Sequence, residues 1–164
     1  EIKQMKNIDI VYPKEKKKLY SLLRTQLIAL TDGVPHTLAN FSNASALLNQ
    51  ALSDINWVGF YFIKENQLVL GTFQGKPACI EIQIGSGVCG TAVAKNETIV
   101  VENVHDFPGH IACDSASNSE IVIPIHAHGE IIGVLDIDSP IFSRFDEEDK
   151  NGLEMLVKVL EEMF

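Results

Sequence analysis

The sequence IVIPIHAHGEIIGVLDIDS, residues 121–139, decides the fold class. Its two halves are rich in β-branched and aliphatic residues and flank the turn residues 127–129, a pattern that predicts an antiparallel hairpin. A second hairpin is predicted upstream, where the run 57–63 (WVGFYFI) is followed by 68–73 (LVLGTF) after a polar turn. Successive hairpins favour an antiparallel sheet over the parallel sheet of βαβ units.

Helices are predicted on both sides of these hairpins. The predicted helical segments are 13–32, 36–52, the short segment 87–95 and the C-terminal segment from Asp146, where Asp149 completes an approximate capping box. Two further short strands are predicted at 79–84 and 98–101. The element order predicts an α+β domain with a central antiparallel sheet of about six strands and the N- and C-terminal helices packed on one face.

Length, charge and hydropathy restrict the class of protein. The chain has 164 residues and a formal net charge of −9, which fits one domain and disfavours binding to nucleic acid. No apolar run approaches the roughly 20 residues needed to cross a bilayer, so we expect no membrane association and a cytoplasmic location. Residues 1–11 are expected to form an N-terminal extension and 12–164 the folded domain.

Three cysteines and one long loop are the candidate chemical features. Cys79, Cys89 and Cys113 contain no C-x-x-C pair, which indicates neither a disulfide scaffold nor a zinc ribbon. Residues 102–118 have no periodicity, and loops of this length are often functional. Cys113 lies in this polar loop, which favours a reactive thiol over a buried one.

Two other motifs have alternative interpretations. The segment 85–90 (GSGVCG) matches the dinucleotide-binding pattern G-x-G-x-x-G, but hairpins lack the parallel crossovers of that fold, so we interpret its glycines as a tight helix start. His105, His110 and Cys113 could supply three zinc ligands, although H-x4-H-x2-C is not an established zinc spacing. We therefore expect no metal site.

Four segments together resemble the free methionine-(R)-sulfoxide reductases, enzymes built on a GAF domain. They are NWVGFY (56–61), GSGVCGTA (85–92), HIACD (110–114) and GVLDIDS (133–139). The resemblance extends from about Tyr12 to the C-terminus. It implies a single GAF domain that reduces free L-methionine-(R)-sulfoxide, with thioredoxin as the external dithiol and no bound cofactor.

The resemblance also implies the roles of individual residues. Cys113 is expected to attack the substrate, Cys79 to be the principal resolving cysteine, and Cys89 a second or back-up thiol; which of the two resolves first stays open. The residues implied for substrate binding are three carboxylates and two aromatic side chains: Glu120, Asp136, Asp138, Trp57 and Tyr61.

The chemistry of the residues agrees with this interpretation. A thiolate reduces a sulfoxide when an acid protonates the departing oxygen, and Glu120 and Asp138 are our candidates for that acid. Asp136 and Asp138 are two residues apart on a predicted strand, so they face one pocket, where mutual repulsion raises a carboxyl pKa. Two alternatives remain: a GAF module that binds a small ligand or senses redox state without turnover, and a zinc-dependent hydrolase. The amphipathic terminal helices are compatible with a homodimer.

Overall fold

The computed structural model describes residues 10–164, and the segment 1–9, most of the predicted N-terminal extension, lies outside the described residues. At its centre is a six-stranded sheet with the order β3-β2-β1-β6-β5-β4, in which all neighbouring strands are antiparallel. The strands are β1 (Trp57–Lys64), β2 (Gln67–Gly75), β3 (Glu81–Gln83), β4 (Ile99–Val101), β5 (Ser119–Ala127) and β6 (Glu130–Ser139). This topology confirms the predicted antiparallel sheet and contradicts a dinucleotide-binding fold.

Both predicted hairpins are present, and the backbone conformation of their turn residues explains why the strands pair. His128 and Gly129 join β5 to β6 with φ values of 52° and 81°, and Glu65 and Asn66 join β1 to β2 with 49° and 62°. Two successive residues with positive φ are what a type I′ turn requires, and this turn matches the right-handed twist of the strands. The turn chemistry therefore sets the pairing within each hairpin, and the two hairpins join where β1 pairs with β6.

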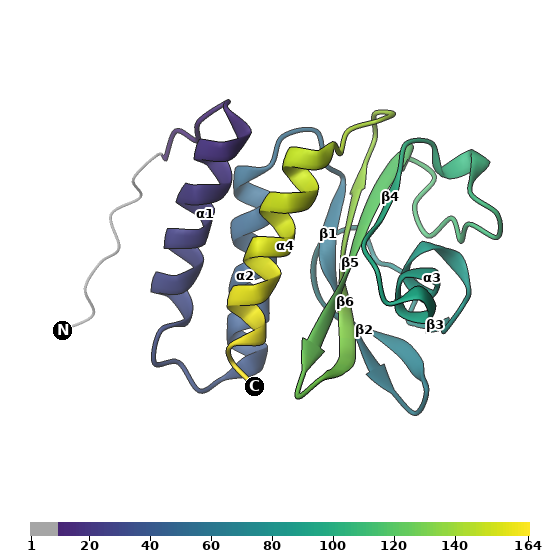
Figure 1. Ribbon diagram of the computed structural model, residues 1–164. Coiled ribbons are helices and arrows are strands. Elements are labelled where there is room, and N and C mark those ends of the chain that lie inside the picture. Colours follow the sequence, from purple (N-terminus) through teal and green to yellow (C-terminus); the bar gives the residue numbers. More distant parts are fainter. Residues whose placement is uncertain (1–9) are drawn as a thin grey trace.

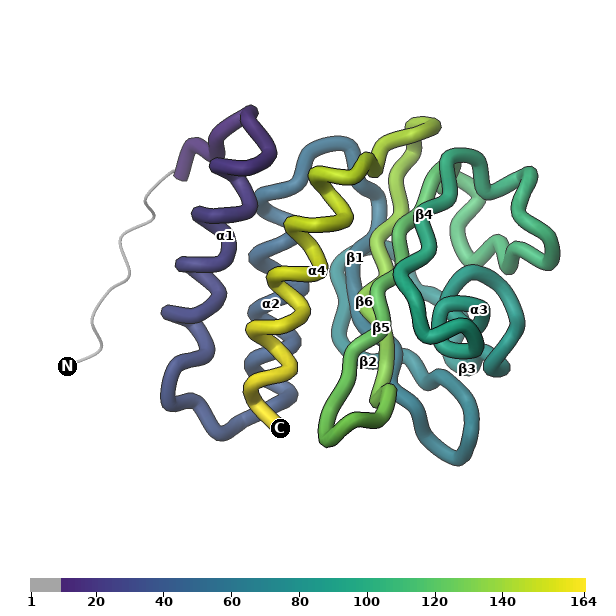
Figure 2. The backbone as a smooth tube through the Cα atoms, viewed as in Figure 1, coloured from purple at the N-terminus to yellow at the C-terminus, as the bar shows by residue number. Residues whose placement is uncertain are grey.

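Three helices cover one face of the sheet (Figure 1). Helices α2 (Thr37–Ala51) and α4 (Glu147–Glu161) pack on the strands, while α1 (Lys16–Thr31) packs on α4 and α2 as an outer layer, a layering that the backbone trace also shows (Figure 2). Helix α4 begins with the predicted capping box, in which Asp146 and Asp149 each accept from the other's backbone N–H. The predicted packing of the terminal helices on one face is confirmed.

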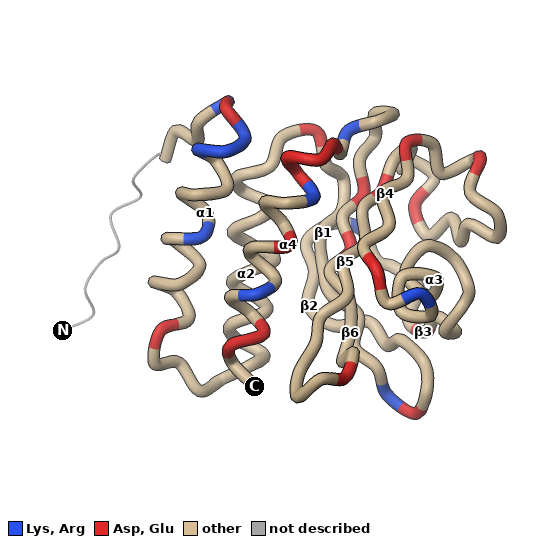
Figure 3. Tube along the Cα trace, viewed as in Figure 1, with Lys and Arg blue, Asp and Glu red and all other residues tan. Residues whose placement is uncertain are grey.

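The opposite face of the sheet is covered by α3 (Gly87–Lys95) and by the long loop, which contains a short 3-10 helix, Val104–Asp106. Strand β3 is shorter than predicted because only three residues pair with β2, which leaves Ile80 68% exposed while Ile82 is buried. Acidic residues lie on the central strands and in the long loop, and also along α4 in the helical layer (Figure 3). No helix within residues 10–164 is long and apolar enough to cross a membrane.

Candidate active site

Strand register brings three carboxylates together on the face that α3 covers. Glu120 on β5 is paired with Asp138 on β6, and Asp138 is paired in turn with Trp57 on β1. Asp136 lies two residues away on the same face of β6. Glu120 and Asp136 are buried and Asp138 is half-buried. The prediction that Asp136 and Asp138 share a pocket is confirmed, and Glu120 joins them from the neighbouring strand.

A glycine on β1 makes room for the aromatic wall. Gly59 lies opposite Asp136, and a Cβ atom at this position would be 2.7 Å from the ring of Trp57. The Trp57 ring stacks between Tyr61, with ring centroids 5.9 Å apart, and Phe73, at 5.3 Å. The predicted wall of Trp57 and Tyr61 is therefore formed, and Phe73, which the sequence analysis did not include, supports it from behind.

Both wall residues also hold the loop that carries Cys79. The indole Nε1 of Trp57 donates to the carbonyl of Lys76 at 3.1 Å, and the hydroxyl of Tyr61 donates to the carbonyl of Cys79 at 3.0 Å. Buried aromatic polar groups need such partners. The wall thus fixes the position of Cys79 as well as one side of the cavity.

The cysteines are divided between a disulfide and a free thiol. Cys79 and Cys113 form a disulfide with their Cα atoms 5.7 Å apart. Cys113 is exposed and Cys79 is half-buried. Cys89 is a free thiol buried on α3, and it lines the same cavity as Cys113. The pairing that the resemblance implies is present, and Cys89 lies beside the carboxylates.

Polar contacts attach the Cys113 loop to β1. The side-chain amide of Asn56 donates to Asp114 and to Ser117, both at 3.1 Å, and Lys76 lies 3.6 Å from Asp114. A hydrogen bond from the backbone N–H of Ala116 lowers the pKa of Asp114 below its ordinary value. Asp114 is therefore a charged anchor next to Cys113. The sequence analysis missed this role, because Asn56 is 58 residues from Asp114 in the sequence.

The long loop also places a histidine in the cavity. His110 Nε2 is 3.7 Å from Glu120 Oε2, and the His110 side chain is 15% exposed. Burial lowers the pKa of His110, which favours the neutral imidazole. His105 instead contacts Asn118 at 3.0 Å, and Cys113 is in the disulfide, so the structure does not form the alternative zinc site of His105, His110 and Cys113.

The three carboxyl groups are shifted toward their neutral forms. Burial raises the pKa of Glu120, and the charge of Asp138 raises it further; burial likewise raises the pKa of Asp136 and of Asp138, each with a contribution from a neighbouring carboxylate. Burial and the charge of Asp136 also raise the pKa of the Cys89 thiol. The site therefore favours protonated carboxyl groups in the cavity that Cys113 also lines.

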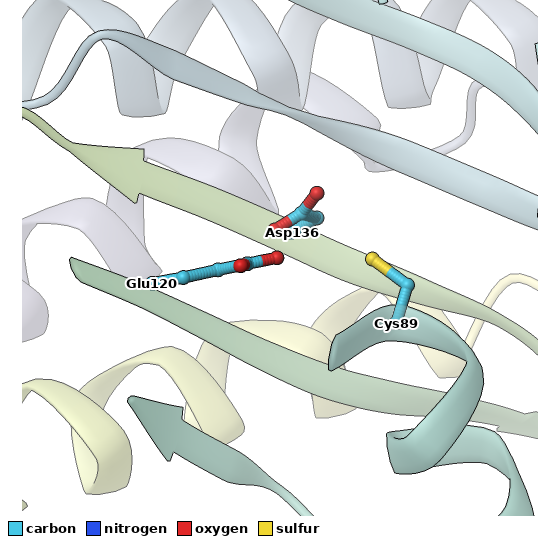
Figure 4. A group of neighbouring side chains, drawn as sticks. All are labelled: Cys89, Glu120 and Asp136. Carbon is cyan, nitrogen blue, oxygen red and sulfur yellow. The ribbon is translucent and has the colours of Figure 1, made fainter. Parts of the chain in front are cut away.

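The cavity among these residues is small. Its volume is about 40 Å³, and its lining includes Trp57, Cys89, His110 and Cys113, which leaves room for about three water molecules. Within it, Cys89, Glu120 and Asp136 project toward one another from α3, β5 and β6 (Figure 4). Chemically, the site combines a cysteine pair joined in a disulfide with carboxyl groups whose raised pKa favours their neutral forms, in a small cavity.

Comparison with known proteins gives close matches over almost the whole chain. The GAF domain model matches residues 21–162. The chain is 54% identical over 148 residues to the free methionine-R-sulfoxide reductase of Escherichia coli, with 90% of each chain covered. It also matches the reduced form of fRMsr from Staphylococcus aureus, with 52% identity, a TM-score of 0.87, and 95% of this chain and 99% of that chain covered. For the free methionine-R-sulfoxide reductase of Neisseria meningitidis in complex with its substrate, the identity is 42%, the TM-score 0.91, and the coverage 94% of this chain and 93% of that chain.

Proposed function

This chain belongs to the free methionine-R-sulfoxide reductases of the GAF domain family, and from that premise we propose that it reduces free L-methionine-(R)-sulfoxide with Cys113 as the attacking thiol. The observation that carries this assignment is the Cys79–Cys113 disulfide beside a group of buried carboxylates. The pair supplies the two electrons, and the carboxylates supply the proton that the reaction needs.

The reaction balances with the groups at hand. The Cys113 thiolate attacks the sulfoxide sulfur, the oxygen is protonated, and oxygen transfer leaves methionine and a sulfenic acid on Cys113. The Cys79 thiol then displaces water from the sulfenic acid and forms the disulfide. An external dithiol, which we propose is thioredoxin, reduces the disulfide, and the exposure of Cys113 supports access by such a partner.

Glu120 and Asp138 are our candidates for the proton donor. Burial raises the pKa of both, which favours the protonated form that can donate. His110 lies next to Glu120 and reaches solvent, so it is placed to return a proton to Glu120 after each turnover. A neutral imidazole is suited to this exchange, because it accepts a proton at one nitrogen and donates from the other.

The remaining site residues are assigned to substrate binding. All four line the cavity; we assign Asp136 and Asp138 to the substrate's ammonium group, whose positive charge favours their ionised forms when substrate is bound, and Trp57 and Tyr61 to its side chain. The small cavity of the disulfide form does not admit an amino acid of this size. We therefore propose that substrate enters the reduced form, after the Cys113 loop has moved away from Cys79.

Three broader assignments are also proposals. We place the domain boundary at residue 12, and we propose a cytoplasmic location because a disulfide that must be reduced in each cycle suits a reducing compartment.

A homodimer is supported by exposed apolar side chains on the helical layer, namely Ile28, Leu30, Leu38 and Phe164. Light scattering at several protein concentrations tests this association.

The direct test of the function is turnover of separated epimers. We expect methionine to form from free L-methionine-(R)-sulfoxide with a dithiol present, and not from the S epimer, because the attacking sulfur and the acid have fixed positions around the S=O group. Binding of the R epimer without release of methionine would contradict the proposal and support the alternative of a non-catalytic ligand-binding or redox-sensing module.

A further inference from the structure

Beyond the proposed reaction, we propose that Cys89, Glu120 and Asp136 form a binding site for a single thiophilic divalent cation of the zinc and cadmium class. The ion would be a regulatory or toxic ligand and not a resident cofactor. It would bind in the same cavity that Cys113 lines.

The geometry is that of an incomplete coordination shell. Cys89 Sγ and one carboxylate oxygen from each of Glu120 and Asp136 all lie within 4.8 Å of one another. Around a tetrahedral zinc ion, sulfur and oxygen ligands are about 3.3 to 3.8 Å apart, given the usual metal–ligand bond lengths. The three side chains come from α3, β5 and β6 (Figure 4). The ligand atoms therefore need to approach one another by only about 1 Å to complete the shell.

A second observation points to a missing ligand. Asp136 is only 6% exposed, and apart from its polar neighbours, the Cys89 thiol and the Glu120 carboxyl group, no hydrogen-bond partner reaches its buried Oδ1 atom. An unsatisfied buried carboxylate oxygen is costly, and a cation is one of the groups that can satisfy it. Among the described residues that line the cavity, there is no Lys or Arg to take that role. Asp138, on the same face, adds to the negative potential.

The available space fits an ion better than it fits the substrate. The cavity of about 40 Å³ in the disulfide form has room for about three water-sized groups. A zinc or cadmium ion with one bound water would fill it, with the water in the fourth coordination position. Zinc commonly accepts this combination of one thiolate, oxygen ligands and an open position taken by water.

A bound ion would exclude the substrate. Asp136 is also the carboxylate that we assign to the substrate's ammonium group, so the ion and the substrate need the same oxygen atoms. This consequence rests on the proposed function, whereas binding of the ion does not. We expect the ion to raise the apparent KM for methionine sulfoxide and to leave kcat unchanged.

The disulfide form of the protein isolates the proposed site for measurement. With Cys79 and Cys113 oxidised, Cys89 is the only free thiol in the chain, so a thiolate-to-cadmium charge-transfer band reports on Cys89 alone. We expect titration with Cd²⁺ to produce this band and to saturate at one equivalent. Zinc added afterwards should remove the band by competition.

Carboxylate variants distinguish a built site from a lone reactive thiol. Asp136→Asn and Glu120→Gln, each made separately, should weaken Cd²⁺ binding by at least about 10- to 100-fold, the loss typical when support for a bound metal is removed. The matched control is Glu130→Gln, an exposed carboxylate on the same strand as Asp136, which should bind Cd²⁺ as the wild type does. Circular dichroism of each variant checks that it is folded.

The result of the titration separates this inference from the proposed function. No band, saturation well above one equivalent, or unchanged binding in both carboxylate variants would overturn the metal site, whatever the enzyme turns over. In the kinetic experiment a phosphine replaces the dithiol, because a dithiol would chelate the ion. Inhibition by Zn²⁺ that lowers kcat without raising KM would overturn the inference that the ion and the substrate occupy the same position. Absence of turnover in metal-free protein would instead contradict the proposed function alone.

Discussion

Leu135 and Asp136 are neighbours on β6, yet they belong to opposite faces of the sheet. Leu135 packs under the helices with Ile121 and Ile137, whereas Asp136 faces the cavity with Glu120. The helical face is apolar and closed. The cavity face buries carboxyl groups, and burial of such groups opposes folding. The comparison teaches that one strand supplies stability through one set of alternate residues and chemistry through the other.

The largest expected effect is on the cavity face. Cys113→Ser should reduce turnover by more than about 10³-fold, because an alcohol is a far weaker nucleophile than a thiol and the residue acts as part of a unit. Methionine formation is measured with excess dithiol, and thermal stability is compared in reductant so that neither protein has the disulfide. Activity near that of the wild type would remove Cys113 from the mechanism.

The carboxylates should have the next largest effect. Glu120→Gln and Asp138→Asn keep side-chain size but remove the acid, and general acid catalysis is typically worth about 10² to 10⁴ in rate. A thiol-specific reagent should still label Cys113 in reduced variants, and Glu130→Gln serves as the control. If both variants turn over within a factor of about three of the wild type, neither carboxylate donates the proton.

A substitution on the helical face should lower the stability of the protein and leave its activity nearly unchanged. Leu135→Ala should lower the free energy of unfolding by about 2 to 5 kcal/mol, since it leaves a cavity in a closed core. The kcat/KM of the remaining folded protein should stay close to that of the wild type. Denaturant unfolding and kinetics at low temperature measure the two quantities. A large loss of kcat/KM with little loss of stability would mean that the two faces are not separate in function.

The smallest expected effect is a gain in protein stability when Asp136, on the cavity face, is replaced by Asn. Burial raises the pKa of Asp136, so the folded protein holds a proton that the unfolded chain has released. The free energy of unfolding therefore falls as pH rises above the ordinary carboxyl range. Asp136→Asn removes this titration and should raise Tm at about pH 8, by about 2 to 4 °C for each kcal/mol gained. The difference should vanish at about pH 3 and below, where the carboxyl of the unfolded chain, with its ordinary pKa of about 3.9, is also protonated.

Melting curves at several pH values test this gain, with Glu130→Gln as the exposed control on the same strand. A Tm difference between Asp136→Asn and the wild type that does not depend on pH would contradict it. So would a variant less stable than the wild type at high pH.

The sequence was sufficient for features that depend on local chemistry. The two-residue spacing of Asp136 and Asp138 on a predicted strand predicted that they share a face, and this is confirmed because the side-chain period of a strand is fixed. Asp146 and Asp149 predicted the start of α4, because a capping box depends only on residues three apart in the sequence. The predicted strand 79–84 was too long, because the length of an edge strand depends on how many residues its neighbour can pair with.

Features that depend on contacts between distant segments could not be predicted in this way. The partner of Cys113 lies 34 residues away, and the spacing of the cysteines alone does not select a pair. His110 lies in a loop without periodicity, so no pattern indicated that it approaches Glu120. The resemblance to a family implied the cysteine roles. Only the structure showed that Asn56 contacts the Cys113 loop and that Phe73 stacks on Trp57.

The most direct test of the central claim is the preference for a free ammonium group. If a buried carboxyl group ionises to hold that ammonium group, acetylation of the substrate nitrogen removes the partner of this buried charge, which costs about 3 to 5 kcal/mol, or about two to three orders of magnitude. We therefore predict that kcat/KM for free L-methionine-(R)-sulfoxide exceeds that for the N-acetyl form and for a short peptide by this factor. Similar kcat/KM values for all three substrates would contradict the account and indicate an open site that accepts oxidised proteins.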